Sequence, residues 1–301
     1  MHVFVTGASG WIGSHTVDDL LAAGHDVTGL ARSDASAAAL ATKGVRVLRG
    51  DLDDLDVLRR GAGAADGVLH LANKHDWSDQ AATNAAERAA VEALGAALVG
   101  TDRPFVVASG IAALAPDRPA TEHDPSPFTG VDSPRGGSEN RALDLVDQGV
   151  RSIAARFSPT THGVGDHGFI AYLTDVARQR GVSAHVGAGT NRWAAVHVTD
   201  AARLVRLGLE QAPAGTRLHA VAEQGIPTSD IAAAIGEALG LPVTSVDPDD
   251  AAEHFGFIGA FFAMEMSGSS DVTRELLGWE PTGPTLLEDI AAGAYAHAAR
   301  R

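Results

Sequence analysis

Three regularly spaced glycines between a short apolar strand and a helix constrain this chain more than any other feature. Gly7, Gly10 and Gly13 follow the predicted strand HVFVT and open an amphipathic helix. In that context one glycine permits a tight turn, one lets the backbone approach a ligand, and one packs the helix on the strand. Free N–H groups at the helix start attract phosphate. A tight turn that binds no ligand is the alternative.

Apolar strands alternate with alanine-rich helical segments through the first half of the chain. Strands are predicted at HVFVTG, DVTGLAR, VRVLRGD, GVLHLAN, PFVVASG and VRSIAARFS, and helices at Trp11–Ala23, Ala35–Lys43, Leu55–Gly61, Ser78–Val99 and Ser138–Gln148. Fully apolar strands in such alternation are typical of a parallel sheet covered on both faces. The sequence therefore predicts an α/β protein with a Rossmann-type doubly wound parallel sheet and helices on both faces.

Composition excludes several classes of protein. The 301 residues are 45% hydrophobic, so a sizeable core is available, and the formal net charge of −15 argues against nucleic acid or an anionic membrane as partner. The absence of cysteine excludes disulfides and thiolate metal sites, and no histidine spacing suggests a metal. No apolar run approaches the roughly 18 residues of a membrane span. We expect a cytoplasmic protein with a small-molecule substrate.

Several segments resemble one enzyme family in the same order along the chain. TGASGWIG resembles the TGxxGxxG loop of the extended short-chain dehydrogenases/reductases, in their NAD-dependent epimerase–dehydratase branch. RGDLDD, VLHLAN, VVASG, RFSPTTHGVGD, WAAVHVTDAA and RELLGWEPT resemble later segments of that family. The resemblance covers nearly the whole chain, and it implies an NAD(P)-binding domain and a nicotinamide cofactor.

The resemblance also implies which residues contact the cofactor. They are the glycine loop, the ends of the second and fourth strands, an acidic segment after the third strand, a helix asparagine, and a turn beside the nicotinamide amide. The predicted set is Gly7, Ser9, Gly10, Trp11, Ile12, Gly13, Arg32, Ser33, Asp51, Leu52, Leu71, Ala72, Asn73, Asn84, Ser158, Pro159 and Thr160.

An arginine ends the second predicted strand, in GLARSD. An acidic side chain at this place would bond the ribose 2′-OH of NAD, whereas an arginine accommodates the 2′-phosphate of NADP. Arg32, with Ser33 beside it, therefore favours NADP(H) over NAD(H). Asp34 keeps NAD(H) open, and an ordinary surface arginine is the alternative for Arg32.

The family's proton-transfer dyad, Tyr-x-x-x-Lys, is absent. The chain has two tyrosines, Tyr172 and Tyr295, and the residues four positions later are Val176 and Ala299. The region where the dyad belongs, TGVDSPRGGSENRALDLV, contains neither a tyrosine nor a lysine. The chain thus resembles an atypical subgroup that keeps the nucleotide loop and lacks the standard active-site residues.

Other side chains must then supply the chemistry. Ser109 ends VVASG, where the family has its catalytic serine, and could orient a substrate carbonyl. Lys74 and His75 follow the fourth strand, whose carboxyl end borders the ligand crevice, and either could donate a proton. Arg135 could bind an acidic group of the substrate. The alternatives are a strand-end serine, a solvated loop tip and a loop arginine.

These residues predict an NADP(H)-dependent oxidoreductase that transfers hydride to or from a small carbonyl, imine or conjugated alkene. A second hypothesis, motivated by the missing dyad, is a redox sensor that binds NADP(H) without turnover. A sugar-nucleotide epimerase or dehydratase comes third, because it depends most directly on the absent tyrosine.

The strict alternation weakens after about residue 160. We expect residues 1–160 to form the NAD(P)-binding Rossmann domain, with 194–222 returning to it, and 161–301 to form mainly a smaller α/β substrate-binding domain. The aromatic segment HFGFIGAFFAMEM is either core between the domains or a lid over an apolar or aromatic substrate. In the family that the chain resembles, the fourth and fifth helices often form a dimer face, and residues 86–98 are rich in small residues, so the resemblance implies a homodimer.

Overall fold

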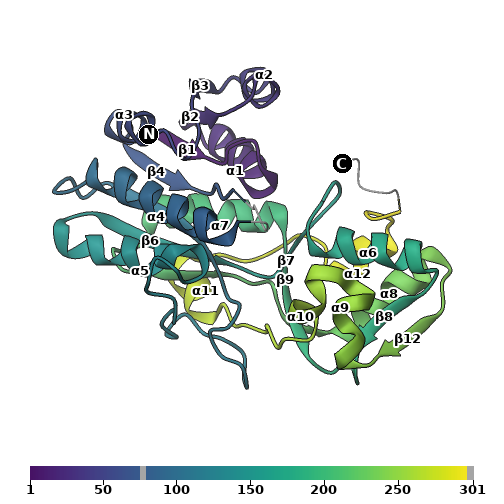
Figure 1. Ribbon diagram of the computed structural model, residues 1–301. Helices are drawn as coiled ribbons and strands as arrows, with labels where there is room; N and C mark the ends of the chain where they lie inside the picture. Colours follow the sequence, from purple (N-terminus) through teal and green to yellow (C-terminus); the bar gives the residue numbers. More distant parts are fainter. Residues whose placement is uncertain (75–78, 297–301) are drawn as a thin grey trace.

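The computed structural model describes residues 1–74 and 79–296, which form a larger and a smaller lobe (Figure 1). The larger lobe is built on a parallel sheet with the order β10-β6-β5-β4-β1-β2-β3, seven strands in the described residues. Their bounds are β1 His2–Thr6, β2 Asp26–Ala31, β3 Arg46–Arg49, β4 Gly67–His70, β5 Pro104–Gly110, β6 Arg151–Phe157 and β10 Arg217–Ala220. The predicted doubly wound parallel sheet is confirmed.

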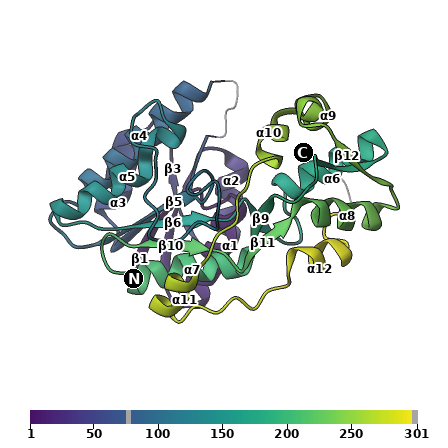
Figure 2. The same cartoon turned by 90° about the horizontal axis from the view of Figure 1, so that it is seen from below.

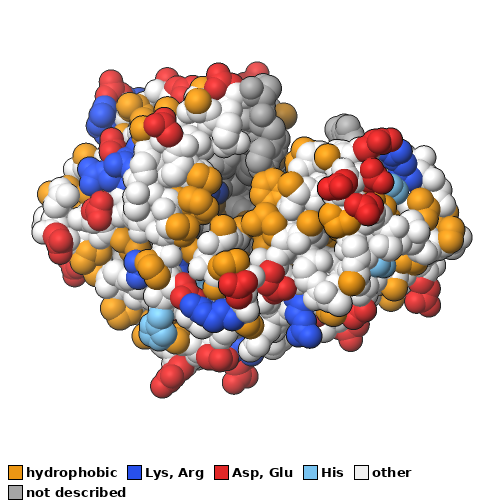
Figure 3. Space-filling model, turned by 60° about the horizontal axis from the view of Figure 1, so that its bottom comes forward, with side chains coloured by type: hydrophobic (Ala, Val, Ile, Leu, Met, Phe, Trp, Pro, Cys, Tyr) orange, Lys and Arg blue, Asp and Glu red, His pale blue; other side chains and the backbone are white. Residues whose placement is uncertain are grey.

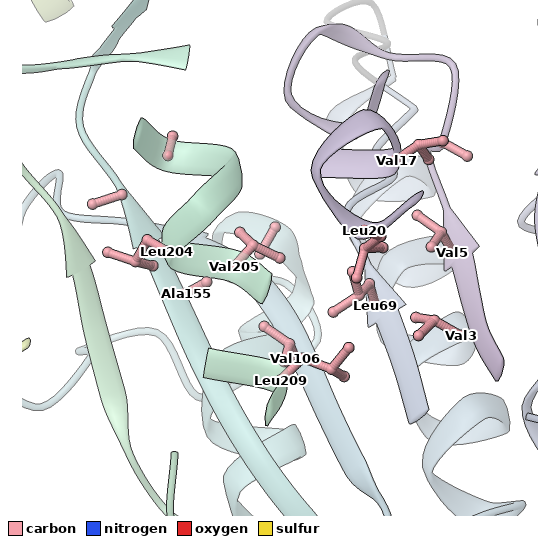
Figure 4. Close-up of a cluster of buried hydrophobic side chains, with 14 of the residues drawn as sticks. Val3, Val5, Val17, Leu20, Leu69, Val106, Ala155, Leu204, Val205 and Leu209 are labelled. Carbon is pink, nitrogen blue, oxygen red and sulfur yellow. The ribbon is translucent and has the colours of Figure 1, made fainter. Parts of the chain in front are cut away.

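Helices cover both faces of this sheet, as Figure 2 shows. One face carries α1 (Trp11–Ala22), α2 (Asp34–Thr42) and α7 (Val198–Gln211), and the other carries α3 (Leu55–Gly63), α4 (Gln80–Ala96) and α5 (Ser138–Leu143). The alternation of side chains along a strand explains the two cores. Val3, Val5, Leu20 and Leu204 belong to one buried cluster beneath α1 and α7 (Figure 4). Phe4 belongs to the cluster on the opposite face.

The smaller lobe surrounds two short sheets. β8 (Ser183–Val186) pairs with β12 (Val243–Val246), and the order β11-β9-β7 joins Glu223–Pro227, Arg192–His197 and Thr160–His162. Its helices are α6 Phe169–Arg180, α8 Thr228–Leu239, α9 Ala251–Phe255, α10 Gly259–Phe262 and α12 Leu286–Ala291. Short 3-10 segments are η1 Pro134–Gly137, η2 Asp144–Gln148, η3 Pro248–Asp250 and η4 Gly256–Ile258.

The chain crosses between the lobes more than once. Within the predicted returning segment 194–222, α7 packs on α1 and β10 pairs with β6, whereas β9 belongs to the three-stranded sheet. Later, α11 (Asp271–Leu277) also packs on α7 and β10. These crossings fix the smaller lobe beside the carboxyl ends of the central strands.

Two of the five predicted helices differ from the structure by more than two residues at one end. The helix predicted over Ser138–Gln148 is α-helical only to Leu143 and continues as η2. The helix predicted from Ser78 begins at Gln80, because the Asp79 carboxylate accepts a hydrogen bond from the Ala82 N–H and caps it. In residues 1–74 and 79–296, no helix has both the length and the apolar character needed to cross a membrane.

Candidate functional site

A cavity of about 1210 Å³ lies between the lobes, at the carboxyl ends of β1, β2, β3, β4 and β6. Figure 3 shows a hollow between the lobes with hydrophobic side chains on both of its sides. The order of the strands reverses at β1, and ligands of open α/β sheets bind at such a reversal. All residues of the predicted cofactor set except Asn84 line this cavity.

The glycine loop forms one wall through its backbone. Gly7 has φ +69°, and a Cβ on it would lie 2.7 Å from the Ala72 nitrogen at the end of β4. A Cβ on Gly13 would overlap the Gly7 carbonyl oxygen. Gly10 is the N-cap residue of α1, so no side chain caps this helix. Its first turn contains no acidic residue. The N–H groups at the start of α1 are thus available to a diphosphate, and the loop fits a dinucleotide.

The end of β2 brings an arginine to the cavity. Arg32 is exposed and lines the cavity, and it forms no ion pair with any residue that the structure describes. Asp34 is directed elsewhere, since its Oδ1 accepts a hydrogen bond from Arg49 at 2.9 Å. Ser33 caps α2 through Ser36. Asp34 is therefore paired with Arg49, whereas Arg32 has no carboxylate partner among the described residues.

The proposed proton donors and carbonyl-orienting serine occupy different places. Lys74 lines the cavity, with its Nζ 2.7 Å from both carboxylate oxygens of Asp53. Ser109 is not part of the lining, and its Oγ donates a hydrogen bond to the Glu139 carboxylate at 2.6 Å. His75 lies outside the described residues. Of the predicted catalytic set, the structure thus brings Lys74 to the cavity.

Glu139 belongs to a buried network behind the wall. The fully buried Arg156 donates to the Glu139 carboxylate from both Nε and Nη2, the latter at 2.5 Å from Oε1. Arg156 Nη1 also lies 3.3 Å from Nε2 of His219, and burial lowers the pKa of His219. The Ser109 hydroxyl therefore faces a carboxylate fixed by an arginine.

The half-buried Arg135 and the buried Asn84 belong to a second network and do not line the cavity. Arg135 has φ +55°, and its backbone N–H donates to Asn84 Oδ1 at 3.0 Å. Its guanidinium donates to Glu87 Oε1 at 2.6 Å. Arg135 and Asn84 thus contact other residues of the protein, and their contacts with substrate and cofactor stay predictions.

Glu87 is the centre of this second network. Its side chain is 2% exposed, and His70 Nε2 lies 3.5 Å from Oε1. Burial by itself would raise the pKa of Glu87, but the Arg135 guanidinium and His70 lower it to about 2. Asn73, which lines the cavity, donates to Glu87 Oε2 at 3.3 Å. The carboxylate thereby connects the cavity wall at β4 to α4 and η1.

The wall from the smaller lobe was missed by the sequence analysis. It contains Asp166, His167, Phe169, Ile170, Tyr172 and Phe257. Burial raises the pKa of Asp166, whose carboxylate accepts hydrogen bonds from the Tyr295 hydroxyl at 2.8 Å and the Gly168 N–H at 2.7 Å. Only the aromatic segment over 254–266 gave a signal for this wall.

The aromatic residues of that segment lie in two different places. Phe255 and Phe262 are buried in the core of the smaller lobe, where Phe262 contacts Trp193 at a ring separation of 5.2 Å. Phe257 instead lines the cavity and meets the Tyr172 ring edge-on at 4.8 Å. One aromatic residue of the segment therefore reaches the site while its neighbours hold the lobe together.

Known proteins resemble this chain over most of its length. The model of the NAD dependent epimerase/dehydratase family matches residues 3–129. Uncharacterized protein C2A9.02 of Schizosaccharomyces pombe is 45% identical over 296 residues, covering 98% of this chain and 100% of that protein. The 4-hydroxy-2-methyl-3-oxo-4-farnesyl-3,4-dihydroquinoline-1-oxide ketoreductase of Stigmatella aurantiaca is 28% identical, over 71% of this chain and 66% of its own.

A solved structure shares the fold. DesIV, a dTDP-glucose 4,6-dehydratase from Streptomyces venezuelae solved with NAD bound, superposes with a TM-score of 0.76 at 22% identity. The match covers 98% of this chain and 96% of that one. The likeness therefore extends over both lobes.

Proposed function

Because this chain belongs to the NAD-dependent epimerase/dehydratase family, we propose that it is an NADP(H)-dependent oxidoreductase acting on a small carbonyl, imine or conjugated alkene. The observation that carries the proposal is the cavity at the start of α1, where glycine backbone and uncapped N–H groups fit a dinucleotide diphosphate. When bound, the nicotinamide ring supplies or accepts a hydride.

Support for NADP(H) over NAD(H) comes from the end of β2. Arg32 lines the cavity there, and Asp34 is bonded to Arg49. A guanidinium pairs well with a phosphate and gains nothing comparable from a ribose hydroxyl. We infer that Arg32 holds the 2′-phosphate.

Lys74 is our proposed proton donor. It lines the cavity after β4, and Asp53 holds its Nζ from both carboxylate oxygens. An ammonium group held at the rim of the site can protonate a substrate oxygen or nitrogen as negative charge develops on it. Ser109 is not part of this proposal, because its hydroxyl hydrogen is engaged with Glu139.

A redox sensor that binds NADP(H) without turnover is the second candidate. It is favoured by two observations at the place where the family has its catalytic residues. The sequence holds no Tyr-x-x-x-Lys dyad, and Ser109 donates to a carboxylate fixed by Arg156. The ketoreductase among the relatives favours the oxidoreductase instead.

The two lysines of the chain provide a matched experiment. We expect Lys74→Ala to lower kcat by roughly 10²–10⁴-fold for NADPH oxidation with a panel of carbonyl and imine substrates. Lys43→Ala should leave turnover unchanged, since Lys43 pairs with Asp18 and lies outside the cavity lining. NADPH affinity, measured by calorimetry, should change little in either variant.

The same assay separates the candidates. Turnover that is equal in wild type and Lys74→Ala would contradict the role of Lys74 but keep the oxidoreductase. Tight binding of NADPH and NADP⁺ without turnover of any compound in the panel would favour the sensor.

A further inference from the structure

The wall that the smaller lobe contributes to the cavity is largely aromatic. Phe169, Ile170, Tyr172 and Phe257 line it. Tyr172 and Phe257 meet edge-on at 4.8 Å between ring centroids, and Phe169 stacks on Phe261 at 6.1 Å. Phe257 lines the cavity and is 48% exposed.

A glycine fixes the position of Phe257. Gly256 has φ +65° and ψ −142°, a conformation that residues with a side chain avoid. A Cβ on Gly256 would lie 2.8 Å from the Tyr172 hydroxyl. The backbone at Gly256 thus sets Phe257 directly beside Tyr172, and the two rings form one surface toward the cavity.

Among the described residues, this wall carries His167 but no lysine or arginine. Both lysines of the chain, Lys43 and Lys74, precede the smaller lobe in the sequence. Arg178 pairs with Asp175 at 2.8 Å and Arg180 donates to the Glu253 carbonyl. Within the described residues, no arginine of the smaller lobe lines the cavity. Asp166 adds a carboxyl group, so this side disfavours an anion.

We propose that the substrate is a neutral carbonyl compound bearing an aromatic ring, which packs against Phe257 and Tyr172. This inference rests on the oxidoreductase function proposed above and names its substrate class. Aromatic rings that pack edge-on or offset gain free energy beyond the area they bury. A carboxylate or diphosphate on the same wall would lose hydration without gaining a counter-charge.

Sugar nucleotides are disfavoured for the same reason. Among the described residues, the arginine and the lysine that line the cavity, Arg32 and Lys74, both lie on the wall of the larger lobe. Arg32 stands at the end of β2, and Lys74 is paired with Asp53. A second diphosphate would have to lie against the wall of Phe257 and Tyr172, where no lysine or arginine of the described residues faces it and Asp166 contributes a carboxyl group.

The test compares matched ligands by calorimetry on the protein with and without NADP⁺, so that binding is measured without turnover. The ligands are 4-methoxycinnamaldehyde, 4-carboxycinnamaldehyde and UDP-glucose. We expect the neutral aldehyde to bind at least about 100-fold more tightly than either anion. Phe257→Ala should weaken the neutral aldehyde about three- to tenfold. Val243→Ala, which removes another exposed side chain of the smaller lobe, should have no effect.

A thermal melt establishes that the variants fold. Phe257→Leu, which keeps an apolar side chain, should bind the neutral aldehyde about two- to threefold more weakly than wild type. Tight binding of the neutral aldehyde that depends on Phe257, without its reduction by NADPH, supports the ligand class and contradicts the oxidoreductase. Equal or tighter binding of an anion overturns the ligand class, whatever the turnover. Failure of the neutral aldehyde to bind at millimolar concentration overturns it as well.

Discussion

The two walls of the cavity are built in different ways. The wall of the larger lobe is made by backbone at strand ends and by glycines such as Gly7 and Gly13, where side chains do not fit. The wall of the smaller lobe is made by side chains, chiefly Phe169, Tyr172 and Phe257. A backbone wall suits a cofactor whose diphosphate is the same in every reaction. A side-chain wall changes its specificity with single substitutions.

The layers behind the two walls also differ. Behind the larger-lobe wall, buried charges join the secondary-structure elements, through Glu87 with Arg135 and Glu139 with Arg156. Behind the smaller-lobe wall lies an aromatic core that includes Trp193. Buried ion pairs depend on fixed geometry, because a lost partner leaves a charge without compensation. The wall of the larger lobe is therefore expected to tolerate substitutions less well than the wall of the smaller lobe.

The largest effect is expected from Gly13→Ala in the backbone wall. The new Cβ would overlap the Gly7 carbonyl oxygen, so the loop must move away from α1. We expect NADPH affinity to fall at least about 100-fold and the free energy of unfolding to fall by about 1–3 kcal/mol. The matched control is Gly63→Ala in α3, where a Cβ meets no atom within 4 Å. Calorimetry and denaturant unfolding measure both. Unchanged NADPH affinity in Gly13→Ala would contradict the claim that this wall has no room for side chains.

Glu87→Gln tests the charges behind that wall. A pKa lowered from 4.5 to about 2 corresponds to about 3 kcal/mol of stability at neutral pH. Because the folded state has the lower pKa, this contribution is present above pH 4.5 and is lost as the pH falls from 4.5 through 2. We expect Glu87→Gln to lower the free energy of unfolding by about 3 kcal/mol at pH 7 and by progressively less below pH 4.5.

Glu92→Gln, in the same helix, is the control. Glu92 pairs with Arg88 and Arg141 but is 45% exposed, so its removal should cost at most about 1 kcal/mol. Urea unfolding at a series of pH values compares the two variants. Equal losses in both would show that burial of Glu87 contributes nothing to the stability of the cofactor wall.

Arg32→Ala should have a smaller effect, confined to one cofactor. Loss of the charged hydrogen bonds to the 2′-phosphate should weaken NADPH binding about 10- to 100-fold and leave NADH binding unchanged. The control is Arg46→Ala at the start of β3, which should change the affinity for neither cofactor. An equal loss for both cofactors would contradict the assignment of Arg32 to the 2′-phosphate.

The larger lobe could be predicted from the sequence because its determinants are local. Glycine spacing, apolar strands and the helix that starts at Trp11 each constrain a short stretch of backbone, and the sheet places those stretches together. Arg32 and Asp51 reach the cavity for the same reason, since each follows the end of a strand.

The remainder depends on contacts between distant segments. Nothing near Arg135 or Ser109 in the sequence indicates that Glu87 and Glu139 engage their side chains. Phe257 lies within an aromatic run in which Phe255 and Phe262 are buried, and its exposure follows from the backbone at Gly256. Such pairings arise from tertiary packing, which residue spacing does not encode.

The central claim is that the glycine wall holds a dinucleotide. Calorimetric titration of ligand-free protein with NADPH, and then with NADH, tests it most directly. We predict one site per chain, saturated at micromolar NADPH and bound at least about tenfold more weakly by NADH. The absence of heat from both cofactors at millimolar concentration would contradict the account.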